Sequence, residues 1–305
     1  MNSLITNFKE FHISISYKCN FKCEHCCQHS SPEDILTIND SDKNNIVDAI
    51  RNAQFDKIFF SGGEPSLCLK EMDEFISIIK SSINSNSKIG IITNGWFVKN
   101  DQLLNQILEK VNILYVSIDK YHLKYITIPE IKKLCDECNT RGIEFQCIST
   151  VDTPEDLLNI SDWEESLGYK IQFQVTLSVG RALDNNIVSN ENRVFTQDTK
   201  FDLYHCPTYG KVLYDPRYGF NSCCCNLLYD KDLEEDRHQI CCKNNIKDFI
   251  KLDFYNFIND DNFFDPAIVN ELIELKYPIK TTPICTYCKY KFTNYFLARK
   301  NIRSV

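Results

Sequence analysis

Short apolar runs alternate with amphipathic segments over the first two thirds of the chain. A strand that is covered on both faces has a continuous apolar sequence, so these runs predict strands. The segments between them place apolar residues at helical spacing and predict helices. The expected strands span Phe11–Ser16, Lys57–Phe60, Lys88–Ile92, Ile113–Ile118, Ile143–Ile148 and Lys170–Val175. The expected helices span Ser41–Asn52, Lys70–Ser82, Asp101–Lys110, Pro129–Thr140 and Pro154–Ser166.

Strands that alternate with helices predict an α/β fold with a parallel sheet and right-handed crossovers. Polar residues follow the end of every expected strand, and barrel enzymes build their sites from loops at this edge of the sheet. For a single hydroxyl or Asn, an ordinary turn or helix cap is an equal interpretation. The six loops contain Lys18–Ser31, Ser61–Pro65, Thr93–Gly95, Ser117–His122, Ser149–Thr150 and Ser178–Arg181.

The character of the sequence changes near residue 184. Residues 184–200 are polar and rich in Asn, and we interpret them as a linker. Residues 1–183 then form the expected sheet-and-helix domain, and residues 201–305 form a smaller domain rich in cysteine. A chain of 305 residues is long enough for both.

The composition is that of an ordinary protein with a buried core, with 43% hydrophobic and 25% charged residues. The net charge of -8 argues against a nucleic acid as partner. No apolar stretch approaches the ~18 residues of a membrane span, and the N-terminus lacks the order of a signal peptide. We therefore expect a cytoplasmic protein without a membrane partner. In a reducing compartment its 16 cysteines favour metal binding or catalysis over disulfides. Four cysteines lie in apolar or helical patterns and are expected to be structural: Cys68, Cys135, Cys138 and Cys147.

Cys19, Cys23 and Cys26 follow the first expected strand in a Cys-x3-Cys-x2-Cys arrangement. Structural zinc sites use four protein ligands, whereas a reactive site keeps one position open. Three thiolates at this spacing suit an iron–sulfur cluster with one iron left for a small molecule. The second expected strand ends in Ser61–Pro65, where two glycines let the backbone approach a ligand and Glu64 supplies a negative charge.

These two motifs, on consecutive loops, resemble the signatures of the radical S-adenosylmethionine (SAM) superfamily. The resemblance implies a partial (β/α)6 barrel of the TIM type, and the number of expected strands agrees with it. It also implies a 4Fe-4S cluster on the three cysteines, with SAM chelating the open iron. In the superfamily the glutamate of the Gly-Gly-Glu motif accepts a hydrogen bond from the SAM amine. The matching residues here are Gly62, Gly63 and Glu64.

Further SAM contacts are expected from the other loops. Ser117 and Asn94 are candidates for the ribose or the carboxylate of SAM, and Arg181 can hold the carboxylate through its bidentate fork. The residue before the third cysteine is usually aromatic in the superfamily, and here it is His25, which we expect near the adenine. Tyr121 and His122 face the same side, where a structural histidine or a helix-entry contact is an equal interpretation.

A second group of cysteines lies in the C-terminal third. Cys206 and Cys223 flank a turn at Tyr214–Gly219, which predicts a β-hairpin whose two ends meet. Cys285 and Cys288 add two thiolates at a spacing common to zinc and iron–sulfur sites. Zinc and an auxiliary 4Fe-4S cluster both fit four cysteines, and we favour the cluster because a first one is already expected.

The chain resembles peptide-modifying radical SAM enzymes that carry an auxiliary-cluster domain of the SPASM or twitch type. Within these it is similar to the YydG-type peptide epimerases, which make D-residues in ribosomal peptides. The similar elements extend over about residues 11 to 295 of this chain. They are Cys19–Cys27, Ser61–Glu64, Asn94–Gly95, Asp119–His122, Ser178–Gly180, His205–Pro207, the adjacent cysteines after the turn, and Cys285–Cys288.

The epimerase pattern has two adjacent cysteines after the hairpin turn, a cluster ligand followed by a free thiol, where this chain has three. Counting from Cys206 makes Cys223 the ligand and Cys224 the free thiol. Counting from the turn glycine moves each assignment one residue later, so that Cys225 is the free thiol. Cys241–Cys242 has no counterpart and is either an extra ligand pair or plain core.

The resemblance implies that a 5′-deoxyadenosyl radical removes a Cα hydrogen from a bound peptide. A thiol of Cys224 or Cys225 then returns a hydrogen atom to the opposite face. A related activity, the formation of thioether or carbon–carbon crosslinks, needs no such donor. A metal-stabilised binding or electron-transfer protein is the alternative of a different class. The expected partners are a ribosomal precursor peptide and a flavodoxin- or ferredoxin-type electron donor.

Overall fold

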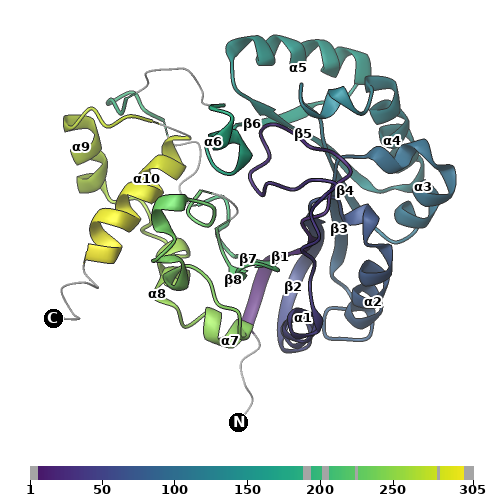
Figure 1. Cartoon of the computed structure of the whole chain (residues 1–305), viewed down its shortest axis with the longest axis horizontal. Coiled ribbons are helices and arrows are strands. Elements are labelled where there is room, and N and C mark those ends of the chain that lie inside the picture. The colour runs from purple at the N-terminus through teal and green to yellow at the C-terminus, as the bar shows by residue number, and fades with distance from the viewer. Residues whose placement is uncertain (1–5, 188–193, 201–205, 224–225, 280–281, 299–305) are drawn as a thin grey trace.

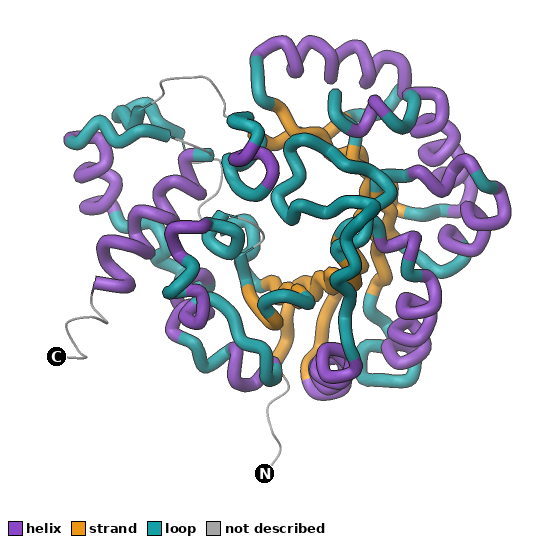
Figure 2. Tube along the Cα trace, in the orientation of Figure 1, coloured by secondary structure: helices purple, strands orange, loops and turns teal. Residues whose placement is uncertain are grey.

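The computed structural model describes residues 6–187, 194–200, 206–223, 226–279 and 282–298. In this part of the chain one curved sheet of eight strands forms a wall, and helices cover its outer face (Figure 1). The strand order is β6-β5-β4-β3-β2-β1-β7-β8. The long loop after β1 lies on the inner side of the wall, between the sheet and the C-terminal helices (Figure 2).

The six expected strands and five expected helices are confirmed. All neighbouring pairs from β1 to β6 are parallel, so the fold is an α/β partial barrel. The strands are β1 (Thr6–Ser16), β2 (Ala53–Gly62), β3 (Lys88–Thr93), β4 (Ile113–Ser117), β5 (Glu144–Val151) and β6 (Ile171–Val175). The helices are α1 (Asp40–Asn52), α2 (Leu69–Lys80), α3 (Asp101–Leu108), α4 (Ile128–Arg141) and α5 (Pro154–Leu167). Short 3-10 turns follow several strands and span Pro65–Leu67, Trp96–Lys99 and His122–Lys124.

Local signals in the sequence begin and end these helices. Thr127 and Thr153 form capping boxes before α4 and α5, and each helix has a proline in its first turn. Gly142 and Gly168 end the same two helices in the left-handed conformation that a side chain disfavours. The main core lies between the sheet and these helices and is built from buried aliphatic and aromatic residues of both.

The predicted β-hairpin is confirmed, and it lies in a place that the sequence pattern did not indicate. β7 (Lys211–Asp215) and β8 (Gly219–Asn221) pair antiparallel, and β7 also pairs parallel with β1. The hairpin therefore extends the sheet of the barrel. Tyr214 on β7 donates a 2.6 Å hydrogen bond to Asp42 on α1, which joins the hairpin to the helical layer.

Apart from the hairpin, the described elements that follow β6 are helices and short turns. They are α6 (Arg181–Asp184), α7 (Ile246–Phe249), α8 (Asp253–Ile258), α9 (Pro266–Glu274) and α10 (Pro283–Lys291), two 3-10 turns at Lys231–Leu233 and Arg237–Gln239, and a π-helical segment at Phe292–Leu297. α8, α9 and α10 contribute to a second hydrophobic cluster, in which Phe195 of the expected linker is buried, whereas α7 packs into the main core. The domain boundaries at residues 183 and 200 stay predictions.

Among the described residues, every helix is too short or too polar to cross a lipid bilayer.

Candidate functional site

A cavity of about 240 Å³ opens at the carboxyl ends of the parallel strands. Residues from the ends or following loops of all six strands line it, as expected for a barrel enzyme. The structure thus brings together, at one cavity, residues of five of the six polar loops that the sequence singled out, whereas Ser178–Arg181 does not line it. Nine of the lining residues were expected to bind the cluster or SAM: Cys19, Cys23, His25, Cys26, Gly62, Gly63, Asn94, Ser117 and, as an open alternative, His122.

The three cysteines of the first motif lie on the loop that follows β1. Cys19 and Cys23 are buried, and Cys26 is half-buried. Burial raises the pKa of the Cys19 thiol to about 12, and the neighbouring Glu64, Cys23 and Cys26 add to this effect. The three sulfur atoms are therefore close enough to influence one another. Three thiols held in a buried cavity fit a cationic iron–sulfur group, because a bound metal is what would stabilise them as thiolates.

Two glycines fix the cysteine loop by close backbone contact. The Gly63 N–H donates a 2.6 Å hydrogen bond to the carbonyl of Ser16, and a Cβ atom on Gly63 would lie 2.2 Å from the Lys18 carbonyl oxygen. At the other end of the loop, Gly180 has a φ of +58°, and its Cβ would lie 2.1 Å from the Cys27 carbonyl oxygen. Side chains at these two positions would displace the loop.

Arg181 lies against this loop rather than on the cavity wall. Its guanidinium donates to the main-chain carbonyls of Cys23, His29 and Ser30 at 2.7, 2.6 and 2.8 Å. Its main-chain N–H donates to the carbonyl of Cys26 at 2.9 Å. These contacts occupy the guanidinium N–H groups that were expected to hold the SAM carboxylate. The role of Arg181 in SAM binding stays a prediction, and its contacts support a role in positioning the cysteine loop.

Glu64 is fully buried and directs its carboxylate into the protein. The carboxylate accepts hydrogen bonds from the Ser66 N–H at 3.0 Å, the Thr93 hydroxyl at 2.8 Å and the Asn94 N–H at 2.8 Å. Burial raises the pKa of Glu64, although these donors oppose the effect. Glu64 therefore connects the loops after β2 and β3. Its predicted contact with the SAM amine stays a prediction.

Asn94 contacts the cysteine loop directly. Its amide nitrogen donates to Asn20 Oδ1 at 3.0 Å and lies 3.7 Å from the Cys19 sulfur. Its oxygen accepts from the Trp96 N–H at 3.0 Å, which fixes the orientation of the amide. An N–H group directed at a ligating sulfur is one of the features that set the potential of an iron–sulfur cluster.

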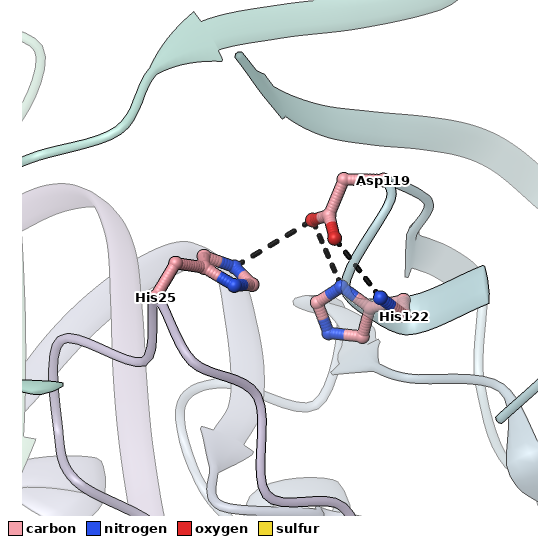
Figure 3. A group of neighbouring side chains, drawn as sticks. All are labelled: His25, Asp119 and His122. Atoms are coloured by element: carbon pink, nitrogen blue, oxygen red, sulfur yellow. Dashed lines mark hydrogen bonds and ion pairs between the residues drawn. The ribbon is translucent and has the colours of Figure 1, made fainter. Parts of the chain in front are cut away.

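His25, Asp119 and His122 form a compact group on the cavity wall (Figure 3). Asp119 Oδ2 lies 2.8 Å from His122 Nδ1 and 3.6 Å from His25 Nε2, and the Thr150 hydroxyl donates to it at 3.1 Å. Burial alone would raise the pKa of Asp119, but the charge and hydrogen bond of His122 lower it. Burial lowers the pKa of His25 to about 4. The carboxylate thus connects two imidazole rings of different basicity.

His25 also stacks on the ring of Tyr121, with 4.4 Å between the ring centroids. Its Nδ1 atom is buried without a hydrogen-bond partner among the described residues, as are Ser30 Oγ and Thr176 Oγ1. All three residues line the cavity. Buried polar atoms without partners indicate that a polar ligand completes the site. This observation fits SAM. Ser30 lies in one of the loops that the sequence indicated, whereas Thr176 lies outside all six and was missed, because a single hydroxyl has no distinctive pattern.

The four cysteines predicted for a second cluster also gather in space. Burial raises the pKa of the Cys288 thiol well above its usual value, and the thiols of Cys206, Cys223 and Cys285 add to this. Cys285 and Cys288 lie on α10, while the other two lie at the ends of the hairpin. Thr208 joins these ends, because its hydroxyl contacts the Cys206 sulfur and donates to the Ser222 carbonyl. Four converging thiols fit a metal centre, and the identity of its metal stays a prediction.

Eight further cysteines were assigned other roles from the sequence. Cys224 and Cys225, the expected hydrogen donors, lie outside the described residues. Cys135, Cys138 and Cys147 are buried in the main core, and Cys68 packs against it, in line with a structural role. Cys241 and Cys242 follow a 3-10 turn, and Cys242 bridges to Phe220 on β8 through two backbone hydrogen bonds. These contacts favour the plain-core interpretation for this pair.

Comparisons with known proteins agree with this geometry. Residues 13–148 match the Radical SAM superfamily. YydG of Bacillus subtilis (strain 168), provisionally described as a peptide biosynthesis protein, is 25% identical over 231 residues, which cover 73% of this chain and 71% of YydG. An S-adenosylmethionine-dependent nucleotide dehydratase of Selenomonas ruminantium is 30% identical over 114 residues, covering 37% of this chain and 39% of the relative.

A solved structure has the same fold over nearly the whole chain. It is described as native anSMEcpe with bound AdoMet and Cp18Cys peptide, and it covers 96% of this chain and 98% of its own, with a TM-score of 0.59 and 13% sequence identity. At this identity the match concerns the fold alone. It extends beyond the barrel to the cysteine-rich C-terminal region.

Proposed function

The chain belongs to the radical SAM superfamily, and we propose that it converts L-residues of a ribosomally made peptide to D-residues. The main support is the position of the second cysteine group. Cys27 and Leu177 line the barrel cavity and also pack against the hydrophobic cluster that contains Cys223 and Cys288. Cys224 and Cys225 follow Cys223 directly in the sequence, which makes their thiols candidates for a reaction at the cavity.

Cys19, Cys23 and Cys26 would hold a 4Fe-4S cluster that binds SAM, and together these groups supply a 5′-deoxyadenosyl radical. Gly62, Gly63 and Asn94 keep the cysteine loop in place. His25, Ser117 and Thr176, which line the cavity, would contact SAM. The second group of cysteines, Cys206, Cys223, Cys285 and Cys288, would hold an auxiliary 4Fe-4S cluster.

The epimerisation itself requires the removal and return of one hydrogen atom. With one electron from the external donor, SAM bound at the first cluster would supply the radical that takes the hydrogen atom of the Cα–H bond of a peptide residue. The thiol of Cys224 or Cys225 then gives its hydrogen atom to the other face of the planar Cα radical. The resulting thiyl radical takes up one electron and one proton, and a flavodoxin or ferredoxin is the class of protein that supplies the electron.

A peptide is the substrate class that the relatives favour. YydG is described as acting in peptide biosynthesis, and the solved structure with the same fold contains a peptide. The dehydratase acts on nucleotides, but its similarity ends within 37% of this chain. YydG matches 73% of this chain, which is more than the 63% matched by a GTP 3′,8-cyclase of Campylobacter fetus, and this larger share favours a peptide over a nucleotide.

Incubation in heavy water tests the proposal. The holoenzyme, with SAM and an electron donor, is incubated with synthetic peptides that correspond to short reading frames beside its gene. The peptides are then hydrolysed, and chiral chromatography with mass spectrometry locates D-residues and deuterium. We expect one deuterium on the Cα of each D-residue, because a thiol exchanges its hydrogen with solvent.

The variants Cys224→Ala, Cys225→Ala and the double variant separate the possible activities. Loss of D-residues with continued formation of 5′-deoxyadenosine supports the proposed donor. Peptide products two mass units lighter than the substrate, without D-residues, would instead identify a crosslinking enzyme. Zinc in place of iron in protein purified without oxygen would favour the metal-stabilised binding protein.

A further inference from the structure

The two edges of the sheet differ. At one edge β8 is only three residues long, is fully buried, and is bridged by Cys242. At the other edge, β6 pairs only with β5 among the described residues, in an unbroken register from Cys147 opposite Ile171 to Val151 opposite Val175. In a parallel pair only half of a strand's N–H and C=O groups face the neighbour. The other half of the main-chain N–H and C=O groups of β6 therefore point away from β5.

β6 lacks the usual features that protect an edge strand. Proteins prevent unwanted pairing with charged residues, prolines or bulges on the edge, or by covering it. β6 has the sequence Ile-Gln-Phe-Gln-Val, without a charge or a proline, and its register shows no bulge. Gln172, Phe173 and Gln174 are all exposed, and the exposed fraction of Phe173 is 56%. An uncharged, open strand of this kind is a template for another extended chain.

The strand also leads directly to the reaction site. Gln174 and Val175 line the cavity, as do Thr176 and Leu177, which continue from them. We propose that an extended segment of the peptide substrate pairs with the open edge of β6 as an additional strand and continues into the cavity. This inference rests on the proposed function, because it assigns the docking site of that peptide.

The alternation of side chains along β6 defines what such a segment presents. Ile148 and Thr150 of β5 line the cavity and lie opposite Gln172 and Gln174 in the register of the two strands. Gln172 and Gln174 are therefore on the cavity face of the sheet, and Phe173 is on the opposite face. Side chains of a paired strand lie beside those of its neighbour on each face. The segment would therefore place an apolar side chain next to Phe173 and turn the residues on either side of it toward the barrel. The peptide segment needs no charged side chains to pair with β6, since β6 itself has no charged residue.

A selected peptide tests this docking site. Random 12-residue peptides displayed on their messenger RNA are selected on the holoenzyme with SAM, and the tightest binder is synthesised. Amide hydrogen exchange is then measured with and without this peptide. We expect slower exchange in the segment 170–176. We also expect N-methylation of the peptide backbone to weaken binding about fivefold or more at alternate positions only, because every second N–H would donate to β6.

Substitution of the edge provides the matched control. Phe173→Lys should weaken binding about tenfold or more, as charged side chains do on edge strands. Leu158→Lys on α5 places the same charge at a residue with an exposed fraction of 69% and should leave binding unchanged. Both variants must retain iron and cleave SAM. The docking site is wrong if amide exchange slows in another segment instead, or if the peptide binds Phe173→Lys as tightly as the original protein. Selection of no binder at all also overturns it. The formation of D-residues in heavy water tests the proposed function separately.

Discussion

The guanidinium of Arg181 donates a 2.7 Å hydrogen bond to the main-chain carbonyl of Cys23, although 158 residues separate them in the sequence. The same cation donates to the carbonyls of His29 and Ser30. A residue that follows β6 thus holds the loop that follows β1, at the point where the partial barrel is open. A long loop with three thiols needs such contacts, since the protein must hold the thiols apart from one another before a cluster forms.

Replacement of Arg181 should therefore impair assembly of the first cluster. Arg181→Gln removes the charged donor, and we expect the content of cluster iron at Cys19–Cys26 to fall about tenfold under limiting iron, as for other residues that orient metal ligands. Iron analysis and electron paramagnetic resonance of the reduced protein measure this. Arg141→Gln, at an exposed ion pair with Glu137, is the control. Normal iron content with weaker SAM binding would show instead that Arg181 holds the SAM carboxylate.

The fold could be predicted to a large extent, because short segments rich in apolar residues mark β1 to β6 and helical patterns lie between them. The addition of β7 beside β1 could not, since pairing between strands so distant in the sequence leaves no local pattern. The thiols of the first site were identifiable from their spacing. The partners of Arg181 and Glu64 were not, because those partners are main-chain groups and neighbouring hydroxyls, which any sequence supplies.

Gly63→Ala should displace the cysteine loop. Its Cβ would lie 2.2 Å from the Lys18 carbonyl oxygen, and main-chain atoms cannot give way as the end of a flexible side chain does. We expect loss of most cluster iron, measured by iron analysis and visible absorbance. Gly142→Ala is the matched control. Gly142 has a φ of +67° but open space around the added atom, so this variant should lose about 1 kcal/mol of stability and keep its iron. Equal iron content in both variants would contradict the prediction.

Asp215→Asn should weaken the junction between β1 and the C-terminal region. The buried carboxylate accepts hydrogen bonds from the hydroxyls of Tyr17 at 2.7 Å and Tyr229 at 2.8 Å. Both hydroxyls donate to Oδ2, while Oδ1 accepts the Arg217 N–H at 2.8 Å, so an amide must turn its NH2 group toward one of these two sets of donors. We expect the free energy of unfolding to fall by about 3 kcal/mol, measured by anaerobic urea denaturation. Asp232→Asn, at an exposed side chain, should change it by less than about 0.5 kcal/mol.

Glu10 should make stability depend on pH at the pairing of β1 with β7. Its carboxylate lies 2.7 Å from His12 Nε2 and 2.9 Å from Lys211 Nζ. Burial alone would raise the pKa of Glu10, but these two partners outweigh it and lower the pKa to about 2. A carboxyl group with a lowered pKa stabilises the fold above its unfolded pKa of about 4.5, and this contribution is lost as the pH falls toward 2.

The variant Glu10→Gln should thus be less stable than the original protein by roughly 2–3 kcal/mol at pH 7. The difference should shrink as the pH is lowered from 4.5 toward 3, because the unfolded chain then binds a proton at Glu10 that the folded protein does not bind. Guanidinium unfolding curves at a series of pH values measure it. Glu74→Gln, which removes an exposed partner of Lys43, should show a difference below about 1 kcal/mol at every pH. A Glu10→Gln difference that stays constant down to pH 3 would mean that packing of the side chain, rather than its charge, joins β1 to β7.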